Sequence, residues 1–145
     1  MRTKLLRCLL LALALSLACG TSTAASKNRK AAKALVLALY EYSGAIRWGD
    51  FERAYDYVDP AVRTEHPLSA IDRARYKQVE MTHYEVSRET KTETTDDRQV
   101  AISFVNRHTQ SERSMSYHEH WRWDAEHKGW WLTTGLPDIT ATDED

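Results

Sequence analysis

Apolar residues are spaced in two ways along this chain, and the spacing changes near residue 76. Before that point they recur every three or four positions, which is the period of an amphipathic helix. After it they recur at every second position, as in a strand with one buried face. The clearest helix is expected over residues 31–48, where one apolar stripe contains Leu35, Leu39, Tyr42 and Ile46.

Three short helices are expected next, because each would begin at a residue that commonly caps helix N termini. Gly49 would end the long helix, as glycine often does. Asp50 and Asp59 can accept hydrogen bonds from the free N–H groups of a first turn, and Pro60 suits the first helical position. Ser69 is a weaker cap of the same kind. The expected helices cover residues 51 to 57 or 58, 60–64 and 70–75.

Four strands are expected in the second half of the chain. The first changes its apolar face between Met81 and Tyr84, which indicates a bulge or bend near Thr82 and His83. The connections are short and polar, so neighbouring strands should pair antiparallel. The expected strands cover residues 78–89, 99–108, 113–124 and 130–134, with turns over 91–97, 109–112 and 124–129.

The alternation of side chains predicts which faces of the strands are buried. In the second strand, Val100, Ile102 and Phe104 share one side. The third strand alternates most cleanly, with serine, histidine and arginine residues on one side. Its opposite side would hold Met115, Tyr117, Glu119, Trp121 and Trp123.

Helices followed by an antiparallel meander predict an α+β fold, with N-terminal helices packed on a curved antiparallel sheet of about four strands. One helical layer against a bent sheet would form a cone with an open end. We expect a single domain over residues 31–137, followed by a loose acidic tail over residues 138–145.

The N terminus has the order of a secretory signal peptide. Three cations, Arg2, Lys4 and Arg7, precede an apolar run from Cys8 to Ala18. This run is shorter than the roughly 20 apolar residues that a membrane-spanning helix needs. Residues 1–18 are therefore expected to direct export and to be removed.

The stretch Leu15-Ser16-Leu17-Ala18-Cys19 resembles the lipobox of bacterial lipoproteins, whose cysteine is diacylated and becomes the first residue. The chain has only two cysteines, Cys8 and Cys19, and both lie in the export segment, so the body needs no disulfide. Two or three acyl chains would anchor the protein stably. The alternative is cleavage after Ala24 or Ala25, which would release a soluble periplasmic protein.

The lipoprotein resemblance implies a location in the bacterial cell envelope, facing the periplasm. Thr21, two residues after Cys19, is not the aspartate that typically retains lipoproteins in the inner membrane, so the outer membrane is favoured. Residues 19–30 would form the lipidated N terminus and an irregular tether. Eleven extended residues would reach about 36–40 Å.

The net charge of the chain argues against nucleic acid as a partner. Residues 1–18 hold three of the 20 Lys and Arg residues and none of the 21 Asp and Glu residues, so the remaining chain is acidic overall. Nucleic-acid recognition needs a clustered basic face, and none is evident here. Attraction to anionic lipid is supported only by Lys27, Arg29 and Lys30.

The segment from Tyr40 to Val58 and the strand ends Trp121-Arg122-Trp123 and Trp130-Trp131-Leu132 resemble the NTF2-like (cystatin-like cone) superfamily. The resemblance spans roughly residues 30–137, and it extends to small NTF2-like lipoproteins of Gram-negative bacteria. This superfamily includes isomerases, dehydratases and many binding or assembly domains, so it implies a fold more than a function. Its isomerases use an Asp base with Tyr and protonated Asp as oxyanion donors, and that trio cannot be placed on this sequence.

Glu119 is the most informative polar residue, because it falls on the aromatic face of the third strand. A buried carboxylate must be paired, protonated or open to a wet pocket. It is therefore either a pocket acid with a raised pKa or a structural carboxylate paired with an arginine such as Arg107. If the cone holds a ligand, the expected lining residues are Tyr42, Trp48, Tyr55, Tyr117, Glu119 and Trp121.

Two other groups of residues could carry a function. The four tryptophans of the last two strands are either sheet cladding or, if exposed, a partner-binding patch. His118 and His120 share one strand face, but a zinc site needs a third or fourth ligand that the sequence does not indicate. No metal and no cofactor is therefore predicted.

These observations favour a non-catalytic, lipid-anchored envelope module that binds a protein partner or a small apolar ligand. The alternative is a periplasmic enzyme, isomerase-like or dehydratase-like, that uses the cone pocket with Glu119 as general acid or base. A homodimer is a further open alternative. A filled interior with exposed aromatic residues outside would favour surface binding over a pocket in the cone.

Overall fold

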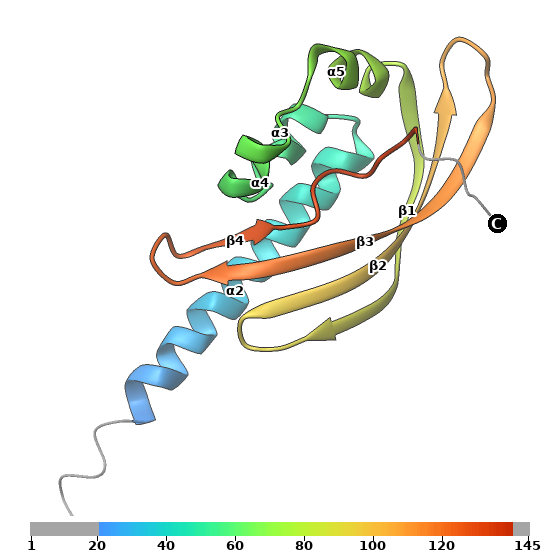
Figure 1. Ribbon diagram of the computed structural model, residues 1–145. Helices are drawn as coiled ribbons and strands as arrows, with labels where there is room; N and C mark the ends of the chain where they lie inside the picture. The colour runs from blue at the N-terminus through green and yellow to red at the C-terminus, as the bar shows by residue number, and fades with distance from the viewer. Residues whose placement is uncertain (1–20, 141–145) are drawn as a thin grey trace, which may run out of the picture.

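Helix α2, Thr21–Arg47, lies along one face of a four-stranded antiparallel sheet (Figure 1). The computed structural model describes residues 21–140. The strands follow one another in the order β1-β2-β3-β4, which confirms the α+β fold predicted from the sequence. The other elements are α3 Phe51–Tyr55, α4 Pro60–Glu65, α5 Ala70–Tyr76, β1 Val79–Lys91, β2 Thr95–Asn106, β3 Glu112–Asp124 and β4 Gly129–Leu132.

Helix α2 begins ten residues earlier than the sequence pattern predicted. The expected irregular tether is helical from Thr21 onward, and its side chains from Ala25 to Lys30 are exposed. Alanine, lysine and arginine favour helix, and a helix that has already nucleated extends readily into such residues. The extension needs no buried face, which is why it leaves no apolar period in the sequence.

The helix breaks and caps agree closely with the prediction. Gly49 has a φ of +72°, the left-handed conformation that commonly follows a helix, and its N–H donates to the carbonyl of Ile46 at 3.0 Å. The Asp50 and Asp59 side chains each accept from a backbone N–H of their own helix. Ser69 forms a reciprocal capping box with Asp72. These local signals place the three short helices.

The sheet bends through irregularities in the pairing of β1 with β2. One register shift falls between Met81 and His83, where the sequence predicted a bulge, and a second falls between Val86 and Arg88. The turn expected over residues 91–97 is shorter, because β2 already begins at Thr95. Thr92 closes this tight turn with hydrogen bonds to residues 94 and 95, so the polar residues that follow join the strand.

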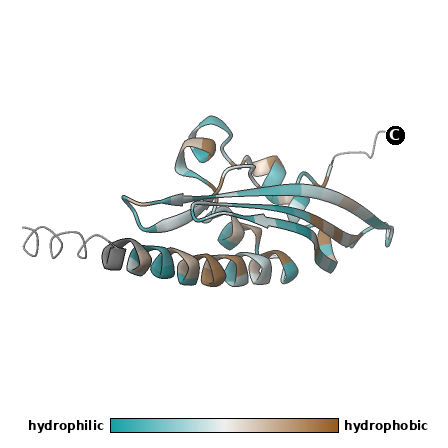
Figure 2. Ribbon diagram, turned by 90° about the horizontal axis from the view of Figure 1, so that it is seen from below, coloured by the Kyte–Doolittle hydropathy of each residue, from teal (hydrophilic) through white to brown (hydrophobic). Residues whose placement is uncertain are grey.

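The core lies between α2 and the inner face of the sheet (Figure 2). The predicted inner residues of β2 are all buried, and so are Trp121 and Trp130. Trp123 and Trp131 are half-buried, and the Trp123 and Trp130 rings lie 5.7 Å apart. Most of this tryptophan set therefore serves the sheet and its core. The Nε1 of Trp130 donates to the carbonyl of Ala31 at 2.9 Å, which ties β4 to α2.

Hydrogen bonds join β4 to the segment between α3 and α4, and they join the C-terminal segment to β3. Val58 and Leu132 form an isolated parallel bridge, with Leu132 N–H donating to Tyr57 and Asp59 N–H donating to Leu132. The tail was expected to be loose from residue 138, but Ile139 is buried and its carbonyl accepts from Arg113 Nη1 at 3.4 Å. An isoleucine can enter the core even within an acidic segment, because its own burial is favourable.

Candidate functional site

The buried carboxylate of Glu119 is surrounded by four hydrogen-bond donors. Its Oε1 accepts from the hydroxyls of Tyr84 at 2.7 Å and Tyr117 at 2.6 Å. Its Oε2 accepts from Trp121 Nε1 at 3.1 Å and Arg98 Nη1 at 3.3 Å. A carboxylate offers about four acceptor positions, so this set satisfies it.

Strand register brings these groups together. Arg98 on β2 pairs with Glu119 on β3, and the guanidinium of Arg98 also lies 3.7 Å from Glu89 on the edge strand β1. Tyr117 and Trp121 flank Glu119 at positions two residues away on the same face. The sequence predicted that an arginine could neutralise Glu119 but suggested Arg107, whereas the partner is Arg98.

The raised pKa values of two tyrosines in this cluster keep their hydroxyls as hydrogen-bond donors to Glu119. Burial raises the pKa of Tyr84 well above its ordinary value, and the neighbouring Glu119 carboxylate raises it further. Burial likewise raises the pKa of Tyr117. Both hydroxyls therefore stay protonated and continue to donate. A carboxylate that is satisfied in this way is suited to holding three strands together and poorly suited to exchanging protons with a substrate.

The six residues predicted to line a pocket do not form one. Tyr42 packs edge-on against Trp121, with 5.1 Å between ring centres, and both lie in the filled interior with Glu119, while the partly buried Tyr117 packs against it. Trp48 lies at the end of α2 and is 90% exposed. Tyr55 lies in a separate groove beside α4. None of the five clefts that we describe within residues 21–140 is lined by Glu119.

Asp96 is a second buried carboxylate, and the sequence interpretation missed it. It lies on the same face of β2 as Arg98 and is fully buried, but neither of its carboxylate oxygens has a hydrogen-bond partner. Burial raises the pKa of Asp96 to about 6, and the charge of Glu89 adds to this. The sequence pattern places Asp96 in the polar turn over residues 91–97. Because β2 begins at Thr95, Asp96 instead lies on the inner face of the strand.

The paired histidines lie on the opposite, outer face of the sheet. His120 Nδ1 lies 2.7 Å from Asp97 Oδ1, and His118 Nε2 lies 3.2 Å from the same oxygen. The hydrogen bond from His120 lowers the pKa of Asp97. No group of three or more residues suited to hold a metal ion occurs within the part of the chain that the structure describes.

The largest of the five clefts is a groove of about 630 Å³ between α4, α5 and the segment 134–138. Two tyrosine hydroxyls hold its walls in place. Tyr55 accepts from Leu68 N–H at 3.1 Å, and Tyr76 donates to the carbonyl of Pro137 at 3.1 Å. Apolar and acidic residues share the lining, which includes Val58, Val62, Leu68, Leu136, Glu65, Asp72 and Asp138.

Cys19, the predicted site of lipidation, lies outside the described residues. Among the helices of residues 21–140, none is both long enough and apolar enough to cross a bilayer.

Comparison with known proteins extends the fold assignment but not the function. No protein-family model matches the chain, and no curated protein matches it significantly. Among solved structures, it is similar to the solution structure of a SEC-C motif containing protein from Rhodopseudomonas palustris, with a TM-score of 0.52 and 16% sequence identity. The match covers 66% of this chain and 72% of that chain. At this identity the similarity shows the fold alone.

Proposed function

We propose that this chain is a non-catalytic, lipid-anchored module of the bacterial cell envelope, with an NTF2-like fold. It binds an apolar group, from a small ligand or from a partner protein, in the groove beside α4 and α5. The observation that carries this proposal is the contrast between two places. The interior of the cone is filled by Tyr42, Tyr117, Glu119 and Trp121, whereas the groove is open and has apolar walls.

The groove has the size and chemistry that a binding site needs. Its volume of about 630 Å³ falls in the range of small-molecule sites, roughly 300–1,000 Å³. Val58, Val62, Leu68 and Leu136 offer apolar surface from two different segments of the chain. The tyrosine hydrogen bonds hold these segments apart, so the groove is formed before a ligand arrives. Tyr55 is the one predicted pocket residue that lines it.

Two features support the anchor. Basic residues, an apolar run and Ala18-Cys19 follow one another in the order that a lipoprotein precursor requires. The described residues, 21–140, contain no cysteine, so the fold of this part of the chain uses no disulfide. An acylated Cys19 would hold the domain at the periplasmic side of a membrane.

Binding in the groove can be tested with the neutral fluorescent probe N-phenyl-1-naphthylamine. We expect its fluorescence to rise on mixing with the protein, and the substitution Val62→Glu to abolish the rise by placing a charge in the apolar wall. Ile71→Glu, at a site on α5 that is exposed and outside the groove, serves as the matched control. Equal responses from both variants would contradict the proposal.

The anchor can be tested by weighing the mature protein from cell envelopes. An N-terminal Cys19 that carries diacylglycerol and a third acyl chain is expected, with Cys19→Ser abolishing incorporation of radiolabelled palmitate. An unmodified chain that starts at Ala25 or Ser26 would show the alternative cleavage and a soluble protein.

A further inference from the structure

The side of α2 that faces away from the sheet is unusually apolar for an exposed helix surface. We call this side the outer face; it consists of Arg29, Lys33, Val36, Leu37 and Tyr40 of α2, together with Trp48, which directly follows the helix. The exposed fractions are 66% for Val36, 58% for Leu37, 76% for Tyr40 and 90% for Trp48. These positions recur at helical spacing, so they form one strip along α2. Hydrophobic turns are visible along this helix in Figure 2.

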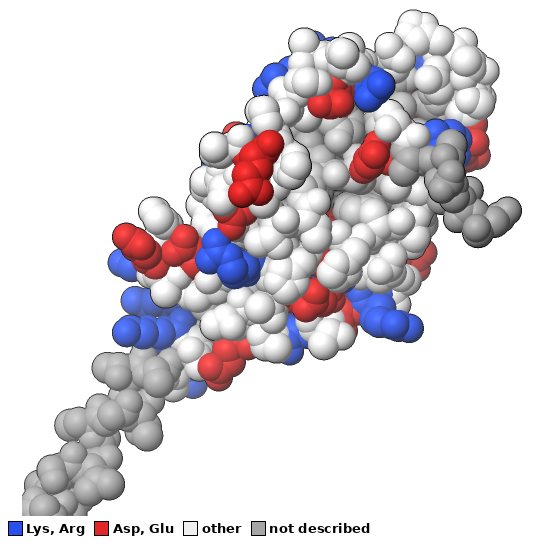
Figure 3. Space-filling model, viewed as in Figure 1, with Lys and Arg blue, Asp and Glu red and all other residues white. Residues whose placement is uncertain are grey.

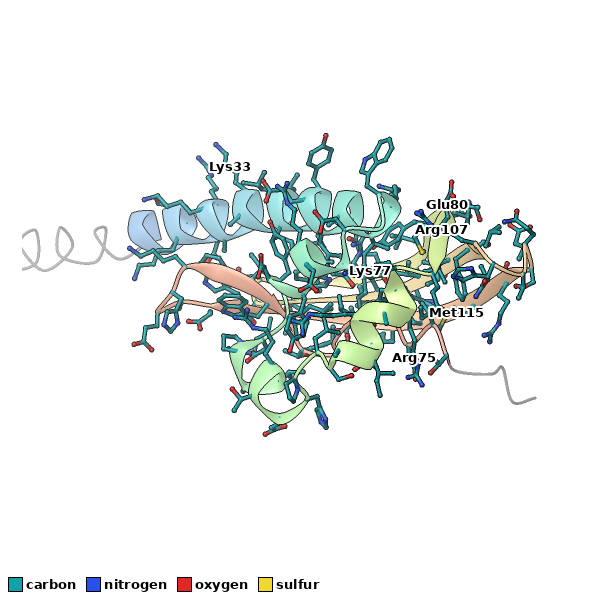
Figure 4. The ribbon with its side chains drawn as sticks, turned by 90° about the horizontal axis from the view of Figure 1, so that it is seen from above. Lys33, Arg75, Lys77, Glu80, Arg107 and Met115 are labelled. Atoms are coloured by element: carbon teal, nitrogen blue, oxygen red, sulfur yellow. The ribbon has the colours of Figure 1, made fainter. Side chains whose placement is uncertain are left out.

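The same helix carries a run of cations with no acid among them. Lys27, Arg29, Lys30 and Lys33 are all exposed, and no Asp or Glu occurs between residues 21 and 40. Lys33 points away from the sheet in Figure 4, and Figure 3, which views the sheet side, shows Lys and Arg together with Asp and Glu near this end of the molecule. The outer face is therefore basic towards its N-terminal end and aromatic towards its C-terminal end.

Two acidic residues near α2, Glu93 and Glu41, form hydrogen bonds with other parts of the structure. Glu93 accepts a hydrogen bond from Asn28, which joins the helix to the β1–β2 turn. Glu41 accepts from the Tyr57 hydroxyl and lies 3.9 Å from Arg53, so it turns towards α3. Each of these carboxylates therefore has a hydrogen-bond partner outside the set Arg29 and Lys33.

Basic residues beside exposed tyrosine, tryptophan and aliphatic side chains match the chemistry of a membrane interface. Amphipathic helices that lie on bilayers combine Lys and Arg with Trp, Phe or Leu, and aromatic rings favour the depth of the headgroups. We propose that the outer face of α2 lies in the headgroup layer of an anionic phospholipid bilayer, with Tyr40 and Trp48 inserted and Arg29 and Lys33 at the phosphates.

Salt screens charges over a short distance, so Lys33 can interact with the lipid only if α2 lies parallel to the membrane surface. If α2 stood upright on its first residue, Lys33 would be about 18 Å above the surface, at 1.5 Å per residue. The Debye length at physiological salt is about 8 Å, so Lys33 would scarcely interact with the lipid from that height. With α2 parallel to the surface, Arg29, Lys33, Tyr40 and Trp48 reach the bilayer together.

This inference goes beyond the proposed function and does not depend on acylation, so it is tested without the lipid. Residues 19–145 with Cys19→Ser contain the whole buried core of the described chain, from Ala31 to Ile139. We expect this protein to float with vesicles of phosphatidylcholine and phosphatidylglycerol at 7:3. Binding to pure phosphatidylcholine should be much weaker, and salt should weaken the binding to anionic vesicles.

Two double variants, each lacking two positive charges, test whether the outer face is the surface that binds the vesicles. Each cation near an anionic surface contributes about fivefold in binding, so Arg29→Gln with Lys33→Gln should weaken vesicle binding about 25-fold. Lys77→Gln with Arg107→Gln removes the same charge from exposed sites that lie away from Lys33 (Figure 4) and should leave binding nearly unchanged. Equal losses in the two pairs would overturn the proposal.

Quenching by brominated lipid tests the insertion of Trp48. Wild-type fluorescence should be quenched on vesicles, Trp48→Phe should remove most of the quenching, and Trp131→Phe should retain it. Quenching that survives Trp48→Phe would overturn the proposal, and so would failure to bind anionic vesicles. A photocrosslinker at Tyr40 that captures a protein in cells while vesicles fail to bind would identify the face as a protein interface. The binding of N-phenyl-1-naphthylamine is measured in the same outer-face variants. If it is unchanged, the proposed function of the groove is independent of membrane binding by the outer face.

Discussion

Glu119 and Asp96 are two carboxylates on one face of the sheet, and their surroundings give them opposite effects on stability. Glu119 has four donors, including the Arg98 guanidinium, whereas both oxygens of Asp96 are without a hydrogen-bond partner. A buried charge stabilises only when its partners compensate the lost hydration. The sequence identified Glu119 because it interrupts an aromatic face, but Asp96 lies among polar residues and gave no such contrast.

Replacing Glu119 should destabilise the fold without affecting the groove. Glu119→Gln leaves the buried Arg98 without its closest carboxylate, and we expect a loss of roughly 3 kcal/mol in the free energy of unfolding. Glu112→Gln, at an exposed position of the same strand, should change it by less than about 0.5 kcal/mol. Urea titrations measure both variants. Unaltered stability together with loss of probe binding in Glu119→Gln would instead assign Glu119 to a binding site.

Asp96→Asn should stabilise the protein at neutral pH. The pKa of Asp96 is about 6 in the folded chain, against an ordinary value of 3.8. The folded state therefore binds this proton more tightly, and the ionised group lowers stability as the pH rises from about 4 to 6. Above pH 6 we expect Asn to add roughly 1–3 kcal/mol, and near pH 4 almost nothing.

Asp97→Asn provides the opposite control for that experiment. The pKa of Asp97 is lowered by His120, so its ionised form stabilises the folded state, and the substitution should reduce stability at neutral pH. Unfolding measured at pH 4.5 and 7.5 should separate the two variants. The same pH dependence in both would show that burial does not distinguish the two carboxylates.

At the scale of elements, local signals predicted the helices and their caps, and periodicity predicted four strands. Asp50, Asp59 and Ser69 act over one turn of chain, so their effect can be read without knowing the fold. The limits of β2 and of α2 were wrong for a different reason. Thr95 to Asp97 become strand through pairing with β1 and β3, and the exposed start of α2 has no buried side to mark it.

Two glycines near the end of α2 should respond in opposite ways to alanine. Gly49 has a φ of +72°, so Gly49→Ala should lower the free energy of unfolding by about 1 kcal/mol. Gly44 lies within the helix with open space around it, so Gly44→Ala should raise stability by roughly 0.5–1 kcal/mol. Thermal unfolding of the two variants measures the difference. A loss in both would mean that the cap does not limit α2.

At the scale of the whole molecule, the site depends on contacts between distant segments. The pairing of Arg98 with Glu119 and the groove between α4 and residues 134–138 both follow from how strands and helices assemble. Composition and spacing could predict that Glu119 would need a partner and that Tyr55 could line a pocket. They could not predict that Trp48 would be 90% exposed, because that depends on which elements pack beside the end of α2.

The last described residues should contribute measurably to stability. Ile139 is buried within the core, so Ile139→Ala should lower the free energy of unfolding by about 2 kcal/mol. Ile71→Ala, at a residue that is 63% exposed, is the matched control and should change it by less than about 0.5 kcal/mol. Equal effects would indicate that residues 138–140 are as loose as their composition suggested.

The hydrogen bond from Trp130 to Ala31 spans 99 positions of the chain, and the bridge from Val58 to Leu132 joins a second pair of distant segments. The contact of α2 with β4 can therefore form only after nearly all of the described chain has been synthesised, whereas α3 and β1 are available to α2 earlier. Closing such large loops is slow compared with forming helices. The final packing of this domain is therefore expected late, after α2 has already met α3 and β1.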